Sequence, residues 1–321
     1  MSDECTENIH LPVLAAEITE AFRDVPAGVI VDATIGMGGH TAGILESRDD
    51  IRVIGIDQDR EAIKLASRNL KKFGDRVKIQ HSNFGEIRAV LKEAGVGKVS
   101  GIVADLGVSS LQMDSAERGF SFKYDAELDM RMDPDSGAPT AAELLGRLSQ
   151  GELANLIYRF GEERFSRRIA SAIVENREKG QPVKTARELA RLIESRAPRS
   201  GREKIHPATR TFQALRIAVN NELGCLEKFL SEAADLVAVD GKMAIITFHS
   251  LEDRIVKNAF LKYSGKCFCP PRIPKCVCGS KRQFEILTRK PIVPSEAEIR
   301  RNPRARSSKL RIVQKIADSN N

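Results

Sequence analysis

Short apolar segments that end at acidic residues alternate with helical segments through the first third of the chain, and this alternation constrains the fold most strongly. The apolar segments predict strands at residues 28–34, 53–56, 77–79 and 101–104. Residues 40–48 and 60–73 carry apolar side chains at helical spacing. Strands that alternate with helices in this way form a parallel, doubly wound sheet with helices on both faces.

The alternation stops after the fourth strand. Residues 140–216 are rich in alanine, leucine, glutamate and arginine and predict helices, for example at 152–160 and 167–177. Strand patterns return at residues 243–248, 284–288 and 308–313. We therefore expect an α/β protein with one discontinuous Rossmann-like domain, residues 1–112 and 217–321, and an inserted helical domain, residues 113–216.

Composition excludes several classes of protein. The 321 residues are 41 % hydrophobic and 30 % charged, as in globular proteins. No stretch reaches the roughly 18 apolar residues that a membrane helix needs, and the N-terminus is acidic where a secretion signal is basic. We expect a cytoplasmic protein with no membrane partner, whose six cysteines are thiols or metal ligands rather than disulfides.

Charge is segregated along the chain. Residues 1–139 have a net charge of −8, whereas residues 140–216 have a net charge of +7. Residues 279–321 carry 11 Lys and Arg against 4 Asp and Glu. Basic segments of this kind suit an anionic polymer such as RNA, although solvated helix faces give the same counts.

A glycine-rich turn follows the first predicted strand in the motif Asp32-Ala-Thr-Ile-Gly-Met-Gly-Gly-His40. Glycines there let the backbone approach a nucleotide-like ligand closely. A dinucleotide-binding fold would place a further glycine at position 41, where this chain has Thr41. This departure disfavours a nicotinamide oxidoreductase.

Acidic residues end the second and fourth predicted strands. Asp57 lies 19 residues after Gly38, where a carboxylate can accept hydrogen bonds from both hydroxyls of a ribose. Asp59 fits the N-cap of the next helix, which leaves Asp57 for a ligand. Asp105 and the loop after it belong to the same edge of the sheet. The pattern predicts an adenosine-containing ligand.

Several long motifs together resemble a known family. They are Asp105-Leu-Gly-Val-Ser-Ser110, Glu117-Arg-Gly-Phe-Ser-Phe122, Leu128-Asp-Met-Arg-Met-Asp133, Gly161-Glu-Glu-Arg-Phe165, His206-Pro-Ala-Thr-Arg-Thr-Phe-Gln-Ala214, Phe248-His-Ser-Leu-Glu-Asp-Arg-Ile-Val256 and Asn302-Pro-Arg-Ala-Arg-Ser-Ser308. In this order they resemble the bacterial 16S rRNA cytosine-N4 methyltransferases called RsmH or MraW. The resemblance extends over nearly the whole chain.

The resemblance implies a class I methyltransferase sheet, S-adenosyl-L-methionine as cofactor and a cytosine of the decoding region of 16S rRNA as substrate. The partner that it implies is 16S rRNA within the small ribosomal subunit. The inserted domain is then the RNA-substrate domain. The family's cofactor contacts fall on Gly38, Gly39, His40, Asp57, Phe84, Asp105 and Gln112. A protein that binds rRNA and the cofactor without turnover is the alternative, but the complete set of contact residues favours an enzyme.

Catalysis is expected to rest on Asp105, because an acceptor beside the cytosine amine favours its attack on the methyl group. Many amino-methyltransferases carry Asn/Asp-Pro-Pro-aromatic at this strand end, and this chain does not. The residue that stacks on the base is therefore left among Phe120, Phe122 and Phe248. We expect His249 to be a structural residue rather than a general base.

Four of the six cysteines cluster as Cys267-x-Cys269 and Cys276-x-Cys278. Two close pairs could supply four thiolates to zinc, but structural zinc sites usually separate the members of each pair by two to four residues. The spacing favours a loop of reduced thiols, and we predict no metal.

Overall fold

The structure, a computed structural model, describes residues 12–197, 206–270, 277, 278 and 280–318. It divides into two compact units, Met1–Gly107 with Cys225–Asn321, and Val108–Gly224. The boundaries differ from the predicted 112/113 and 216/217. Val108 and Met113 pack against the core of the inserted unit, as do Ala218 and Val219, so these flanking segments belong with the insert.

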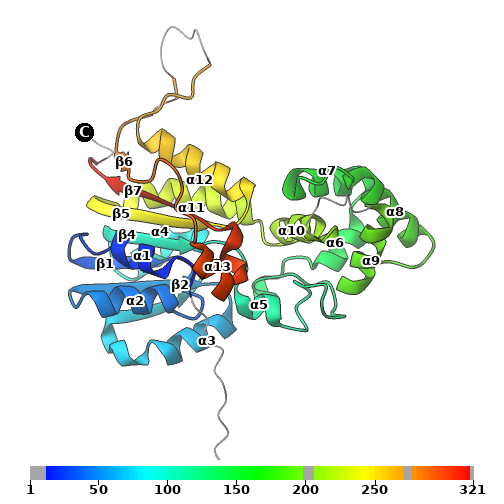
Figure 1. Cartoon of the computed structure of the whole chain (residues 1–321), viewed down its shortest axis with the longest axis horizontal. Helices are drawn as coiled ribbons and strands as arrows, with labels where there is room; N and C mark the ends of the chain where they lie inside the picture. Colours follow the sequence, from blue (N-terminus) through cyan, green and yellow to red (C-terminus); the bar gives the residue numbers. More distant parts are fainter. Residues whose placement is uncertain (1–11, 198–205, 271–276, 279, 319–321) are drawn as a thin grey trace, which may run out of the picture. The chain divides into compact units, whose positions relative to one another are not determined.

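The discontinuous unit contains a seven-stranded sheet in the order β3-β2-β1-β4-β5-β7-β6 (Figure 1). The strands are β1 Gly28–Asp32, β2 Ile51–Asp57, β3 Val77–His81, β4 Val99–Asp105, β5 Val237–Thr247, β6 Phe284–Ile286 and β7 Lys309–Lys315. The first five strands are parallel, and β7 is antiparallel to both β5 and β6. The prediction of a Rossmann-like α/β sheet is confirmed.

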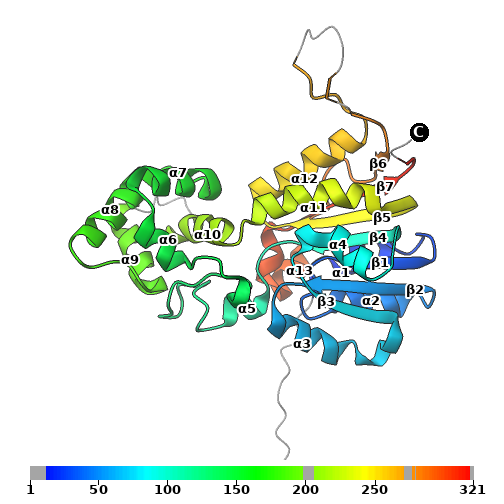
Figure 2. The same ribbon diagram turned by 180° about the vertical axis from the view of Figure 1, so that it is seen from behind.

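Helices cover both faces of this sheet. They are α1 Ala15–Ala21, α2 Gly39–Ser47, α3 Arg60–Asn69, α4 Ile87–Glu93, α11 Glu222–Leu236, α12 Ser250–Tyr263 and α13 Glu296–Arg301. Viewed from opposite sides, α1 and α2 lie over one face, and α4 and α11 over the other (Figures 1 and 2). None of the helices that the structure describes is long and apolar enough to cross a membrane.

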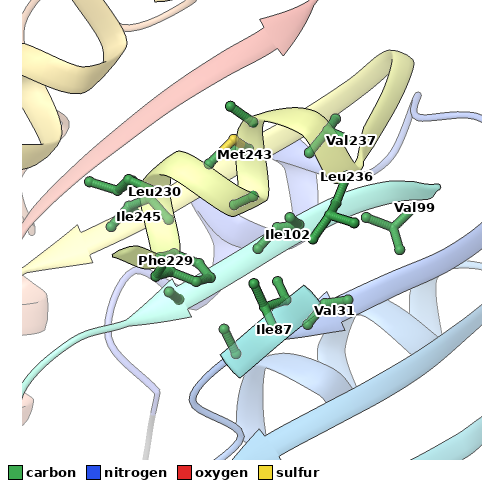
Figure 3. Packing of buried hydrophobic residues seen from close by; sticks show 14 of the residues in the cluster. Val31, Ile87, Val99, Ile102, Phe229, Leu230, Leu236, Val237, Met243 and Ile245 are labelled. Carbon is green, nitrogen blue, oxygen red and sulfur yellow. The ribbon is translucent and has the colours of Figure 1, made fainter. Parts of the chain in front are cut away.

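The apolar character of the strands follows from burial on both faces. All residues of β4 except its last are buried, because helices exclude water from both sides of a parallel sheet. On one face, Ile102 and Ile245 from the strands pack with Ile87 of α4 and Phe229 of α11 (Figure 3). Ile30 and Val103 belong to the core on the opposite face, with Ile44 of α2.

The inserted unit is helical and has its own core. Its helices are α5 Ser110–Asp114, α6 Ala141–Arg147, α7 Gln150–Gly161, α8 Ser166–Glu178, α9 Ala186–Arg196 and α10 Ala208–Val219. Capping boxes begin α5, α6, α7 and α9, so side chains satisfy their first backbone N–H groups. A Cβ atom at Gly161 would lie 2.5 Å from the carbonyl oxygen of Arg210. Glycine thus permits the close packing of α7 on α10.

A predicted helix and a predicted strand have different bounds in the structure. The helix expected over residues 60–73 ends at Asn69 and continues as a 3₁₀ segment, Lys71–Arg76. Gly74 interrupts that segment with φ of 53°, a conformation that glycine adopts without strain. β5 begins at Val237, before the predicted turn, and passes through Asp240 at φ of 65°.

Candidate cofactor site

The glycine turn after β1 is the first part of the site. Gly38 caps α2 in the left-handed conformation, with φ of 87°, and its N–H donates to the carbonyl of Ile35 at 2.7 Å. A Cβ atom at Gly38 would lie 2.7 Å from the side chain of Leu70, and one at Gly39 would lie 3.0 Å from Pro12. The turn therefore needs glycine at these positions, because neighbouring side chains occupy the space of a Cβ atom.

Asp57 ties this turn to the end of β2. Its carboxylate oxygens accept hydrogen bonds from the backbone N–H groups of Gly36 and Asp59, each at 2.9 Å. Asp59 caps α3 through the N–H of Glu61, which confirms its predicted role. The further expectation that Asp57 is left without a structural task is wrong. Each carboxylate oxygen still has a second lone pair for a ligand hydroxyl.

Burial changes the acidity of Asp57. Removal of its carboxylate from water raises the pKa to about 6, and the nearby charges of Asp59 and Asp32 act in the same direction. The two backbone hydrogen bonds oppose this rise but do not cancel it. A ligand that hydrogen-bonds to the ionised carboxylate of Asp57 would therefore bind a group whose pKa, about 6, lies close to neutral pH.

His40 and Asp105 form the second part of the site. Nε2 of His40, in the first turn of α2, lies 3.5 Å from a carboxylate oxygen of Asp105 at the end of β4. Burial alone would lower the pKa of His40, but the Asp105 carboxylate, with the charge of Asp32, raises it. Within the described residues, both ring nitrogens of His40 and Oδ1 of Asp105 are buried without an aligned hydrogen-bond partner.

Unpartnered buried polar atoms are unusual, because each one costs desolvation free energy of about 1–3 kcal/mol. Asp105 is itself positioned by its backbone N–H, which donates to Oγ1 of Thr34 at 2.7 Å. The His40–Asp105 pair is therefore held in place by the fold while its polar atoms lack partners. Such an arrangement fits a polar or charged ligand at the carboxyl end of β4.

Asp32 and Thr41 form a buried pair near His40 that the sequence analysis did not predict. Thr41 Oγ1 donates to Asp32 at 2.7 Å, and both residues are buried. Burial raises the pKa of Asp32. Thr41 appeared in the sequence only as the residue that breaks the dinucleotide glycine pattern. The signal available in the sequence was a polar residue in the first turn of the helix that follows an acidic strand end.

Phe84 and Gln112 are the other predicted cofactor contacts. Phe84 follows β3, and its half-buried ring meets that of Phe229 edge-on at a centroid distance of 5.4 Å. Gln112 belongs to the inserted unit, where it forms the capping box of α5 with Ser109. The structure thus brings Gly38, His40, Asp57 and Asp105 to one edge of the sheet. Cofactor contact by Gln112, as by the other six predicted residues, stays a prediction.

Among the aromatic candidates, Phe248 lies beside the loop after β4. A Cβ atom at Gly107 would be 3.5 Å from its ring, which is half-buried. In the inserted unit, Phe120 is buried, and Phe122 stacks on His206 at 4.3 Å. His249 caps α12 through a capping box with Glu252, the structural role that was expected.

Comparison with known proteins agrees with these features. The profile of the MraW methylase family matches residues 7–316. Proteins named ribosomal RNA small subunit methyltransferase H are 49 % identical over 310 residues in Heliobacterium mobile and in Geobacter sulfurreducens, which covers 96 % of this chain and 99 % of each relative.

A solved structure, an rRNA methylase from Streptococcus thermophilus, aligns over 94 % of this chain and 93 % of its own with 10 % identity and a TM-score of 0.39. That score is too low to support an argument, and the fold assignment rests on the strand order. Profile and relatives together establish that the chain belongs to the MraW methylase family.

Proposed function

We propose that this protein transfers a methyl group from S-adenosyl-L-methionine to N4 of a cytosine in the decoding region of 16S rRNA. The family membership and the names of the rRNA methyltransferase relatives support this activity. The single structural observation that carries it is the His40–Asp105 pair, with its buried unpartnered polar atoms, at the edge that also holds the glycine turn. Ribosome synthesis places such an enzyme in the cytoplasm, with no membrane partner.

The cofactor would be held by groups of matching chemistry. Asp57 would accept hydrogen bonds from the ribose hydroxyls, and Phe84 would offer an apolar face to adenine. The backbone of Gly38 and Gly39, with His40, would face the methionine moiety. When bound, S-adenosyl-L-methionine supplies an electrophilic methyl group on a positively charged sulfonium, which the acidic edge of the sheet complements.

The target amine is a poor nucleophile because its lone pair is delocalised into the cytosine ring. In the proposed mechanism, Asp105 accepts a hydrogen bond from this amine and stabilises the positive charge that develops on nitrogen. Phe248 is the aromatic residue beside this loop and is our candidate for stacking on the base. The amine proton leaves after methyl transfer, so no strong base is required.

The inserted unit is the proposed site of RNA contact. Arg167, Arg168 and Arg196 line a concave surface of about 670 Å³ at α8 and α9. Arg167 and Arg168 are exposed, as cations that contact phosphates must be. Arg196 also pairs with Glu175 at 3.4 Å. Together with the net positive charge of residues 140–216, this surface supports binding of rRNA phosphates.

The decisive experiment is incubation of the purified chain with methyl-labelled S-adenosyl-L-methionine and unmodified 30S subunits. We expect label in N4-methylcytidine after nucleoside digestion, with the Asp105→Asn variant as the matched control. A parallel reaction with protein-free 16S rRNA identifies which form is the substrate. Cofactor binding without transfer to either RNA would instead indicate an assembly factor, and binding of NAD an oxidoreductase.

A further inference from the structure

Three cysteines converge in the loop between α12 and β6. The Sγ atoms of Cys267, Cys269 and Cys278 lie within 4.8 Å of one another. The sequence spacing favours ordinary thiols, because Cys267 and Cys269 are separated by one residue. The path of the backbone nevertheless brings Cys278 back to this pair, which the spacing does not reveal. Cys5 and Cys276 lie outside the described residues, and nothing below rests on them.

The distances between the sulfurs suit a metal ion. Cys267 and Cys278 have their Sγ atoms 3.7 Å apart, far longer than a disulfide bond of about 2.05 Å. Two thiolates on a tetrahedral zinc ion, each at about 2.3 Å from the metal, are separated by about 3.8 Å. Three sulfurs gathered in this way form most of a zinc coordination shell.

Backbone N–H groups donate hydrogen bonds to two of the three sulfurs. The N–H of Cys269 donates to Cys267 Sγ at 3.4 Å, and the N–H of Val277 donates to Cys269 Sγ at 3.3 Å. The hydroxyl of Ser280 lies 3.2 Å from Cys278 Sγ. Donors around metal-bound thiolates stabilise their negative charge and orient them.

Hydrogen bonds also join the two ends of the loop outside the cysteine cluster. The backbone carbonyl of Tyr263 accepts the N–H of Gln283 at 2.9 Å, and Ser280 Oγ donates to the carbonyl of Lys266 at 2.8 Å. Cys267 is exposed, whereas Cys269 and Cys278 are half-buried. A metal ion bound by the three cysteines would link residues 267–269 to residue 278.

We propose that Cys267, Cys269 and Cys278 bind one Zn²⁺ ion as thiolates and that this structural site holds the loop after α12 in place. Binding releases a proton from each thiol to solvent and changes no oxidation state. The site belongs to the discontinuous unit but is separate from the glycine turn and from Asp105. It is therefore independent of the proposed methyl transfer.

The test measures zinc in the full-length chain, purified with a phosphine reductant and without a polyhistidine tag. We expect about one zinc per chain by inductively coupled plasma mass spectrometry. Cys267→Ser, Cys269→Ser and Cys278→Ser should each lower the zinc content at least tenfold. Cys225→Ser, in α11 and outside the cluster, is the matched control and should retain the wild-type content.

Two further measurements keep the proposal testable where a variant folds poorly. Cobalt added to metal-free wild-type protein should give the thiolate charge-transfer and tetrahedral absorption bands, and Cys225→Ser should give the same bands. A chelator should increase cleavage of the loop by protease without altering cofactor binding. The proposal is overturned if metal-free wild-type protein takes up neither zinc nor cobalt. It is equally overturned if the cluster variants retain zinc. A Cys267–Cys278 disulfide in protein purified with the phosphine reductant would also overturn it.

Discussion

Nε2 of His40 lies 3.5 Å from the carboxylate of Asp105, so the first turn of α2 and the end of β4 form an ion pair when His40 is protonated. Both groups retain buried polar atoms without partners in the described part of the chain. The charges of the site are thus coupled, and we expect a change at Asp105 to affect both the proposed methyl transfer and the titration of His40.

Replacing Asp105 with asparagine should separate binding from transfer. The amide keeps the shape and one acceptor but loses the charge that stabilises the developing ammonium. We expect cofactor affinity within roughly tenfold of wild type and a larger fall in the single-turnover rate with 30S subunits. Calorimetry and rapid-quench measurements test the two parts. Wild-type single-turnover rates would mean that other groups hold the amine.

The same variant should shift the titration of His40. The Asp105 carboxylate opposes the effect of burial and raises the pKa of His40. Its removal should therefore lower that pKa, because the imidazolium loses its nearest negative charge. Proton NMR of the ring resonances against pH measures the shift, with a His40→Gln variant to assign the signal. An unchanged titration would show that the two groups do not interact in solution.

Asp57→Ala should weaken cofactor binding more than it slows transfer from bound cofactor. A charge-assisted hydrogen bond contributes about 1.5–3 kcal/mol, which corresponds to roughly ten- to a hundredfold in affinity. Asp57 also holds Gly36 and Asp59, so the comparison should include Asp57→Asn. Calorimetric titration with S-adenosyl-L-methionine measures the effect, and an unchanged dissociation constant would leave Asp57 a purely structural role.

Cofactor affinity should depend on pH through Asp57. The pKa of about 6 in the folded chain exceeds its ordinary value of 3.8. The protonated group therefore stabilises the fold below pH 3.8, and this contribution is lost as the pH rises through about 6. Ribose hydroxyls favour the ionised form, so affinity should rise by up to about tenfold per pH unit below pH 6. The rise should be absent in Asp57→Asn.

The sequence predicted all seven strands and the acidic strand ends, because a buried parallel strand must be continuously apolar and Asp57 and Asp105 interrupt that pattern. It did not predict that Asp57 is engaged by Gly36, since this contact joins positions that only the folded turn brings together. The Asp32–Thr41 hydrogen bond was missed for the same reason. The convergence of Cys278 with Cys267 was considered from the sequence, as a possible zinc site, but the spacing disfavoured it. Contacts of this kind depend on three-dimensional backbone paths and have no fixed spacing.

The Asn302–Ser308 motif provides the final prediction. Ala305 is buried in the core, whereas Arg304 and Arg306 on either side of it are exposed. The sequence also suggested phosphate contacts for Arg300, Arg301 and Lys309, of which Lys309 pairs with Asp253 at 3.2 Å. Arg304→Ala/Arg306→Ala should flatten the plot of log RNA affinity against log salt by about one to two units. Cofactor affinity should not change.

A control double variant, Arg23→Ala/Lys72→Ala, removes the same charge from other exposed positions and should leave the salt slope as in wild type. The competing hypothesis is that the tail arginines are structural and pair with acids such as Asp129 or Asp133. Asp129 binds Arg131 through both carboxylate oxygens. Lower thermal stability of the tail variant with an unchanged salt slope would contradict RNA contact by these arginines.

The insertion between β4 and β5 has a consequence for biosynthesis. β4 ends at Asp105 and its partner β5 begins at Val237, so the sheet stays incomplete until the ribosome has made the whole inserted unit. At about 5–20 residues per second, this delay lasts several seconds. The apolar edge of β4 is exposed during that time, while the inserted helices can already form their own core from local contacts. Pairing of β5 with β4, which completes the centre of the sheet, is therefore a late event in the life of each new chain.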